Sequence, residues 1–334
     1  MGYILMYQIE DAFYPVLAAI GVPVNLVTIV ILARGNCGLS KCIMWYLVGM
    51  AVADLLVVIM DPILTVIVVI YFPYSFLRIT PVCTLVLFFG FAVTVVSVWL
   101  TVAFTFDRFV MICCEKMKTK YCTEKTAAVV VGVVGVLGIL EALPWYFTIG
   151  PQYMVDNVPM SCANKPSFFT STAWGAYQLF HFIFSPVVPF FLILLLNILT
   201  VRHILVASRA RRQLQGCNNR ERHKDPVIES RRKSIILLFS ISGSFVLLWV
   251  TRVVYNIYTQ LDGNHSYSTY TDPRFITERV SLMLQLLSSC TNTCIYAVTQ
   301  TKFREELKNG VKFPLCLIMN LCSSQSRVNG LRPS

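Results

Sequence analysis

The sequence predicts an all-α membrane protein: a bundle of seven transmembrane helices followed by a short amphipathic eighth helix. Of its 334 residues, 56% are hydrophobic and only 13% are charged, whereas soluble domains carry about 25% charged residues. Seven apolar runs are long enough to cross a bilayer, for which about 20 residues suffice. Basic residues cluster between these runs, as expected of loops held at an anionic cytoplasmic leaflet.

The predicted spans are apolar runs bounded by polar or charged segments. In chain order they are Ala12–Ala33, Ile43–Tyr71, Cys83–Cys113, Thr126–Ile149, Thr172–Val206, Ser234–Gln260 and Phe275–Thr299. Residues 1–11 are expected to form an extracellular N-terminus, 12–299 the bundle, 300–312 the surface helix and 313–334 a cytoplasmic tail. The surface helix carries Phe303, Leu307 and Val311 at helical spacing between charged residues.

The distribution of positive charge predicts the orientation. Most of the 28 Lys and Arg residues fall on the side that holds the loops after spans one, three and five and the tail. That side is expected to be cytoplasmic, so the chain is a multi-pass plasma-membrane protein with its N-terminus outside. The same arrangement makes nucleic-acid binding the weaker interpretation of the net charge of +11.

Two cysteines are expected on the outer side. Cys83 opens the third span and Cys162 lies in the loop above it, in an oxidising compartment where the two can form a disulfide. Cys122, Cys217, Cys316 and Cys322 are expected inside, where thiols stay reduced.

Charged residues within the spans mark candidate functional sites. About thirty largely uncharged residues lead to Asp107-Arg108-Phe109, and such charges are costly in lipid unless they lie at a polar boundary or inside the bundle. Asp54, in the middle of the second span, is expected to face inward for the same reason.

Six of the spans carry polar, aromatic or proline residues in a specific order. In spans one, two, three, five, six and seven, these residues are Asn25, Asp54, Cys83 with Asp107-Arg108-Phe109, Pro189, Phe245 with Trp249, and Asn292-Thr-Cys-Ile-Tyr296. Over about Ala12 to Val311 this pattern resembles the rhodopsin-like (class A) G-protein-coupled receptors. Leu-Trp-Val-Thr-Arg252 and Phe-Leu-Ile-Leu-Leu-Leu-Asn197 look most similar to a group of orphan receptors reported to respond to aromatic amino acids and peptides.

The resemblance implies an external ligand, a heterotrimeric G protein as the internal partner, and roles for particular residues. Activation and coupling would involve Asp107, Arg108, Phe109, Asn197, Phe245, Trp249, Asn292 and Tyr296. A structural sodium ion would lie among Asp54, Ser97, Ser289 and Asn292, the alternative being a water-mediated polar network. Arg209, Arg211, Arg212 and Lys233 would flank the G-protein cleft, the alternative being simple attraction to anionic lipid.

The sequence also departs from the family pattern. The family's Asp-Arg-Tyr motif is Asp-Arg-Phe109 in this sequence. Thr251 and Thr293 replace the family's prolines in the sixth and seventh spans, and Asn197 replaces a tyrosine in the fifth. Proline kinks a helix by removing a backbone hydrogen bond. The sixth span is therefore expected to bend by other means, at Ser242-Gly243-Ser244.

Arg252 is the predicted ligand anchor. It lies three residues after Trp249, too deep to reach water easily, so it needs an inward anionic partner. Asp61, Glu141, Glu278 and a ligand carboxylate are the alternatives. Other residues expected around the same aromatic-rich cavity are Phe88, Phe91, Trp174, Tyr255 and Asn256.

The sequence lacks the patterns that are typical of membrane transporters and of enzymes. A secondary transporter usually shows two matching halves with broken helices, and an enzyme would need a constellation such as His-Glu-x-x-His. Neither pattern is present in the sequence, so neither a transporter nor an enzyme is favoured.

Asn264 begins an N-glycosylation sequon in the last outer loop, and Cys316 and Cys322 are candidate palmitoylation sites.

Overall fold

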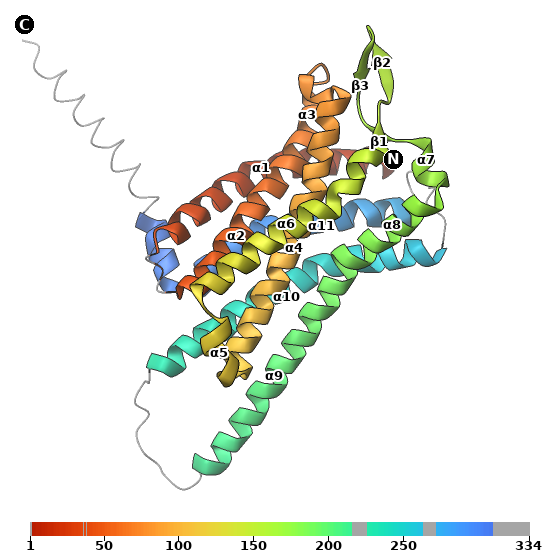
Figure 1. Ribbon diagram of the computed structural model, residues 1–334. Coiled ribbons are helices and arrows are strands. Elements are labelled where there is room, and N and C mark those ends of the chain that lie inside the picture. The colour runs from red at the N-terminus through yellow and green to blue at the C-terminus, as the bar shows by residue number, and fades with distance from the viewer. Residues whose placement is uncertain (1, 36, 38, 216–225, 263–271, 310–334) are drawn as a thin grey trace, which may run out of the picture.

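The computed structural model describes residues 2–35, 37, 39–215, 226–262 and 272–309. Within these residues, seven long helical spans form one bundle (Figure 1). In chain order they are α1 (Gly2–Ala33); α2 (Lys41–Val58), continued by η1 (Ile59–Ile67) and α3 (Val68–Tyr71); α4 (Thr80–Cys113); α6 (Glu124–Thr148); α8 (Thr172–Phe182), continued by η3 (Ile183–Val187) and α9 (Val188–Gln215); α10 (Pro226–Asp262); and α11 (Pro273–Thr299). The predicted fold class is confirmed.

Short elements connect the spans. The helical ones are η2 (Phe76–Arg78), α5 (Glu115–Tyr121) and α7 (Pro166–Thr170), and the strands are β1 (Ile149–Gly150), β2 (Tyr153–Val155), β3 (Val158–Met160) and β4 (Ala163–Asn164). The β2–β3 hairpin and the N-terminus lie at one end of the bundle, which we call the hairpin end (Figure 1). The opposite end, where Arg34, Lys41, Arg108 and Arg202 lie, is called the basic end.

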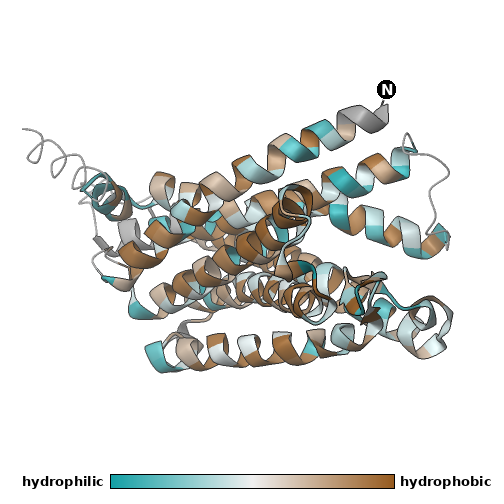
Figure 2. Cartoon of the chain, turned by 90° about the horizontal axis from the view of Figure 1, so that it is seen from above, coloured by the Kyte–Doolittle hydropathy of each residue, from teal (hydrophilic) through white to brown (hydrophobic). Residues whose placement is uncertain are grey.

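Six spans of the described chain are long and apolar enough to cross a membrane, namely all except α11. Hydrophobic residues predominate along the middle of the helices (Figure 2). α11 is more polar because Ser288, Ser289, Asn292 and Thr293 follow one another along it, yet it packs along α10 and against α1 and α2. Its polar residues face neighbouring helices, which is how a helix of this composition is accommodated in a membrane.

The first helix begins before the apolar run that predicts it. α1 starts at Gly2 rather than near Ala12. Met6 and Glu10 are buried, and the Glu10 carboxylate lies 3.6 Å from the Arg279 guanidinium of α11. Residues 6–10 therefore pack against the bundle as part of α1, although the charges at Glu10 and Asp11 interrupt the apolar pattern.

Two spans widen into π-helix next to a proline. η1 contains Pro62 and η3 contains Pro186. A proline inside a helix removes one backbone donor and clashes with the preceding turn, and a π-helical turn accommodates the disruption and is frequent at functional sites. Within η1, the Thr65 hydroxyl donates to the Met60 carbonyl oxygen at 2.8 Å.

The sixth span, which lacks the expected proline, is one continuous helix from Pro226 to Asp262. In the segment where we expected a bend, the Ser242 hydroxyl donates to the Leu238 carbonyl oxygen at 2.7 Å and the Ser244 hydroxyl donates to the Ile241 carbonyl oxygen at 2.9 Å. Such bonding back to the preceding turn often bends helices. The expected bend at these serines therefore stays a prediction, which the continuous helix does not test.

The loop between α6 and α8 folds into two small antiparallel ladders, β1–β4 and β2–β3. Asp156 and Asn157 form the tip of the β2–β3 hairpin with positive φ angles of 47° and 62°. This is the left-handed conformation that a two-residue hairpin turn requires and that Asp and Asn adopt more readily than most residues. The hairpin rises above the end of the bundle (Figure 1).

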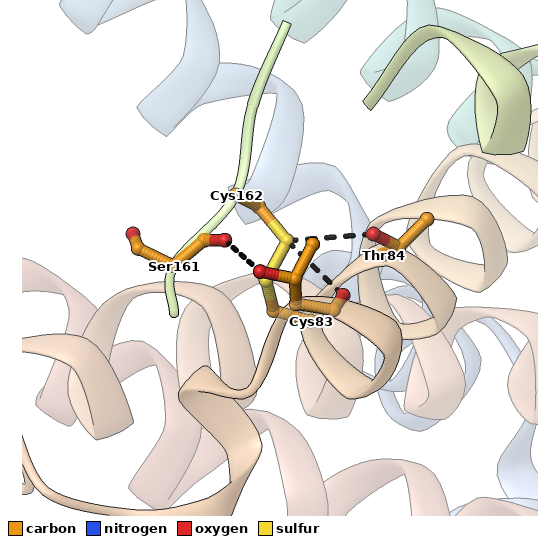
Figure 3. The surroundings of a disulfide bond; sticks show 5 residues. Cys83, Thr84, Ser161 and Cys162 are labelled. Carbon is orange, nitrogen blue, oxygen red and sulfur yellow. Dashed lines mark hydrogen bonds between the residues drawn. A yellow bond between two sulfur atoms is a disulfide. The ribbon is translucent and has the colours of Figure 1, made fainter. Parts of the chain in front are cut away.

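A disulfide joins this loop to α4. Cys83 and Cys162 are bonded, as predicted, and Figure 3 shows the hydrogen bonds around them. The Thr80 hydroxyl donates to the Ser161 carbonyl oxygen at 2.8 Å, and the Ser161 amide donates to the Arg78 carbonyl oxygen at 2.6 Å. The loop is therefore fixed over the bundle by one covalent bond and by two hydrogen bonds at the neighbouring Ser161.

Residues 301–309 form the short helix expected after the seventh span. Phe303 is fully buried, and its ring meets Tyr296 edge-on at 5.8 Å between centroids. Leu307 packs against the same apolar cluster, whereas Lys302 and Arg304 are exposed. The described part of this helix thus has the predicted amphipathic pattern. Asn264, Cys217, Cys316, Cys322 and residues 310–334 lie outside the described residues.

Removing the disulfide is expected to destabilise the protein. Cys83→Ala or Cys162→Ala should each cost about 2 to 5 kcal/mol, because the bond restricts the unfolded chain. The double variant should lose no more than either single variant, since all three remove the same bond. The measurement is the thermal unfolding midpoint of the purified protein, with Cys294→Ala, an exposed free cysteine, as the control. Additive losses from the two single variants would contradict the expectation.

Candidate functional site

A pocket of about 360 Å³ opens among the helices in the half of the bundle nearer the hairpin end. Residues of η1, α4, α6, α8, η3, α10 and α11 line it. Both π-helical segments contribute to its wall, Asp61 and Thr65 from η1 and Ser185 and Pro186 from η3. The proline-induced widening of these two spans therefore shapes the pocket.

Arg252 and Asp61 lie in this pocket. Their side chains are close enough for electrostatic attraction. Of the carboxylates considered as partners for Arg252, Asp61 is the one that lines the pocket with it. Ionisable side chains this far inside a membrane protein mark a functional site by default.

Glu141, the second carboxylate considered, has another partner. Its side chain contacts His181 Nδ1 at 2.7 Å, and the Tyr177 hydroxyl donates to its backbone carbonyl oxygen at 2.8 Å. His181 lies in the pocket wall. The pocket wall thus includes His181, which contacts Glu141 behind it and joins α6 to α8; the sequence did not point to this contact.

Aromatic rings make up much of the remaining wall. Phe91 stacks on Trp145 with 4.6 Å between ring centroids, and His181 meets Trp145 edge-on at 5.3 Å. Trp249 lines the pocket from α10, where Phe245 stacks on it at 5.1 Å. Rings arranged in this way offer large apolar contact surfaces for a ligand with an aromatic group.

Four residues of the predicted ligand set line the pocket, namely Asp61, Phe91, Arg252 and Asn256. The other four, Phe88, Trp174, Tyr255 and Glu278, are not among its lining residues. Phe88 is buried with Ala92 and Ala142 at the α4–α6 contact. Tyr255 lines a separate groove near the start of α11, and Trp174 meets Tyr177 edge-on. Helical phase separates Phe88 and Tyr255 from their lining neighbours Leu87 and Asn256, because each step along a helix turns by about 100°. Trp174 and Glu278 lie four residues before Gln178 and Leu282, which is one turn away along the same helix face.

Asp54 is the centre of a polar cluster deeper in the bundle. It is 2% exposed. Ser97 of α4 donates to one carboxylate oxygen at 2.6 Å, and the Asn292 amide of α11 donates to the other at 2.8 Å. A cavity of about 10 Å³ lies beside it and is also lined by Ser288 and Trp249. Trp249 Nε1 donates to the Ser288 hydroxyl at 3.1 Å.

Ser289, the fourth predicted sodium ligand, is buried but is not among the residues that line the Asp54 cavity. Its backbone carbonyl oxygen accepts a hydrogen bond from the Asn25 amide at 2.9 Å. Ser288, one residue earlier, lines the Asp54 cavity instead. Three of the four residues that the resemblance implies, Asp54, Ser97 and Asn292, therefore lie in one cluster. The serine that lines the cavity is the neighbouring Ser288.

Arg108 is buried at the basic end of α4, with 1% of its surface exposed. Its guanidinium pairs with Asp107 and donates to the Ser234 hydroxyl of α10 at 3.4 Å. The Cys42 thiol of α2 donates to the Asp107 carboxylate at 3.3 Å. Phe109 is half-buried beside this pair. The contacts hold α2, α4 and α10 together where they approach the membrane boundary.

The family described as 7 transmembrane receptor (rhodopsin family) matches residues 24–296. The match covers most of the chain and extends from the first span to Tyr296. The chain belongs to this family. The receptor is therefore a multi-pass membrane protein, and a transporter is not favoured.

Two of the receptor's departures from the family pattern have visible structural consequences. The Thr293 hydroxyl, where the family has proline, bonds to the Thr28 hydroxyl at 2.8 Å and to the Val24 carbonyl oxygen at 3.3 Å. Asn197, where the family has tyrosine, accepts a hydrogen bond from the Ser242 hydroxyl at 3.0 Å. The replacements therefore add polar contacts between α11 and α1 and between α9 and α10.

Proposed function

We propose that the receptor binds an aromatic amino acid or a short peptide at the hairpin end and activates a heterotrimeric G protein at the basic end. The observation that carries this proposal is the pocket itself. It combines a guanidinium, a carboxylate and aromatic walls within one cavity of about 360 Å³. This is the size and composition of a site for a small ligand.

The charges suggest how such a ligand would lie. A ligand carboxylate would pair with the Arg252 guanidinium, whose planar fork matches a carboxylate bidentately. The ammonium group of an amino acid or peptide would pair with Asp61, the neighbouring anion in the pocket. An aromatic side chain would then meet Phe91, Trp145 and Trp249. The ligand would thereby exchange the internal attraction between Arg252 and Asp61 for contacts of its own.

The proposed orientation has the N-terminus and the hairpin outside and the basic end in the cytoplasm. Positive charge in loops favours the cytoplasmic side, and the Cys83–Cys162 bond at the other end suits an oxidising compartment.

G-protein activation would then begin at Arg108. When α10 moves outward, Arg108 would leave Ser234 and reach the cleft that receives the terminal helix of the G protein.

The basic residues proposed to flank that cleft lie on α9 and α10. Arg209 lines a groove on the outer face of α9 and α10, and Lys233 lies exposed on α10. The side chains of Arg211 and Arg212 lie outside the described part of the chain. Contact with a G protein thus remains a proposal for Lys233, whereas the position of Arg209 favours contact with lipid.

We further propose a sodium ion at Asp54 in the resting receptor. A hard cation prefers oxygen ligands around a carboxylate. The Asp54 carboxylate, the Ser97 and Ser288 hydroxyls and the Asn292 side-chain oxygen supply such a set. The ion would neutralise a charge that is otherwise buried in the membrane. A polar network bridged by water is the alternative.

Arg252 substitutions test the ligand anchor. Arg252→Ala should weaken the agonist by about 2 to 5 kcal/mol, and Arg252→Lys should also weaken it because lysine lacks the planar fork. The measurement is nucleotide exchange on a purified G protein, as dose-response curves for aromatic amino acids and short peptides at matched surface expression. Tyr255→Phe, close in sequence but outside the pocket, is the control. Unchanged potency in both Arg252 variants would move the anchor elsewhere.

Arg108 substitutions test the coupling site. Arg108→Ala should abolish nucleotide exchange at unchanged surface expression, because the side chain that meets the G protein is removed. Asp107→Asn keeps Arg108 but weakens its resting ion pair, so it should raise exchange in the absence of agonist. Full coupling by Arg108→Ala would refute the assignment.

Sodium dependence tests the ion site. The thermal unfolding midpoint should be higher in sodium chloride than in N-methyl-D-glucamine chloride of equal concentration. At ten times the dissociation constant, ion binding would stabilise the receptor by about 1.4 kcal/mol. Asp54→Asn should remove the difference between the two salts. Equal midpoints for the unmodified receptor would favour the water network instead.

A further inference from the structure

A second large cavity lies outside the helix bundle, in the groove between α9 and α10. Its volume is about 880 Å³. Figure 1 shows the two helices spreading apart toward their basic ends. Leu194, Ile198 and Val201 line the groove from α9, and Phe239, Gly243 and Val246 line it from α10. We call it the α9–α10 groove.

The groove faces the surrounding membrane. Ile198 is 62% exposed and Leu247, at its edge, is 73% exposed. Gly243 deepens it, because a Cβ atom at this position would meet nothing within 4 Å. The apolar lining is complementary to a hydrocarbon chain.

Arginines line the end of the groove nearest the membrane surface. Arg202 and Arg209 both lie in its wall. They are seven residues apart, which places them about two turns apart on the same face of α9. Residues 172–201 contain no Asp, Glu, Lys or Arg, and such a helix spans about 45 Å, close to the thickness of a bilayer with its headgroups. Arg202 is therefore at headgroup depth.

A polar pair lies deeper in the same groove. The Ser242 hydroxyl donates to the Asn197 side-chain oxygen at 3.0 Å, and both residues line the groove. Asn197 precedes Arg202 by five residues, which puts it about 7 Å deeper. This is where the ester groups of a phospholipid lie when its phosphate is level with Arg202. The groove thus changes from cationic to polar to apolar, in the order of the parts of a phospholipid.

We propose that the α9–α10 groove holds one anionic phospholipid of the leaflet at the basic end. Arg202 and Arg209 bind its phosphate and headgroup, Asn197 and Ser242 face its ester groups, and one acyl chain lies along Ile198, Val246 and Leu247. Basic pockets between transmembrane helices are a known type of site for anionic headgroups. A sterol would match the apolar part alone and would leave both arginines without an anion.

The site can be tested by native mass spectrometry of the full-length receptor in detergent. Palmitoyl-oleoyl-phosphatidylserine is titrated in, with the phosphatidylcholine of the same chains as the comparison. Phosphatidylserine should bind with higher affinity than phosphatidylcholine. Arg202→Gln/Arg209→Gln should weaken the tightest phosphatidylserine site by about 30-fold, since a basic residue near the membrane surface contributes about 1 kcal/mol. Lys302→Gln/Arg304→Gln, which removes two exposed charges from residues 301–309, should leave that site unchanged.

A filled groove provides an independent test. Gly243→Leu places a side chain into the open space of the groove. This side chain should occupy the place of the acyl chain and thereby weaken lipid binding. Gly132→Leu is the matched control, because a Cβ atom at Gly132 also meets nothing within 4 Å but lies on α6. Thermal unfolding midpoints verify that each variant is folded. Equal affinity for phosphatidylserine and phosphatidylcholine, wild-type binding by the double arginine variant, or equal binding by the two leucine variants would each overturn the proposal.

Discussion

Lipid offers no hydrogen-bonding partners, and this constraint determines where the receptor's polar side chains lie. Asp54 is the clearest case. One carboxylate oxygen is bound by Ser97 of α4 and the other by Asn292 of α11. Because a buried charge without partners is strongly unfavourable, three spans must meet at this point. The polar composition of α11, which makes it the least apolar span, is explained by the same requirement.

Other polar contacts extend this arrangement toward both ends of the bundle. Asn25 joins α1 to α11 next to the Asp54 cluster, and Trp249 joins α10 to α11 on its other side. Nearer the basic end, Asp107 and Arg108 join α2, α4 and α10. α10 is thus held at rest by contacts at two depths. Both would have to change if the helix moved during activation.

The residues that depart from the family pattern provide contacts of their own. A proline at position 293 would have no hydroxyl to bond with Thr28, so the seventh helix is tied to the first more closely than a proline would permit. The single hydroxyl proton of Ser242 is shared between the Leu238 carbonyl oxygen of its own helix and the Asn197 side-chain oxygen. A helix without a proline kink but with a polar contact to α9 forms one wall of the α9–α10 groove. The same substitutions that alter the bundle interior therefore help to shape its outer surface.

The sequence by itself determined the membrane class, the order of the spans, the Cys83–Cys162 bond and the inward position of Asp54. These follow from hydropathy, charge and order along the chain, which can be read without knowing which side chains meet. Only the tertiary structure decided which neighbouring residue faces a given cavity. His181 and Ser288 line these cavities, whereas Tyr255 lines a separate groove and Ser289 is absent from the lining of the Asp54 cavity. A single residue step turns a side chain by about 100°, and a π-helical turn shifts this phase by an amount that hydropathy does not encode.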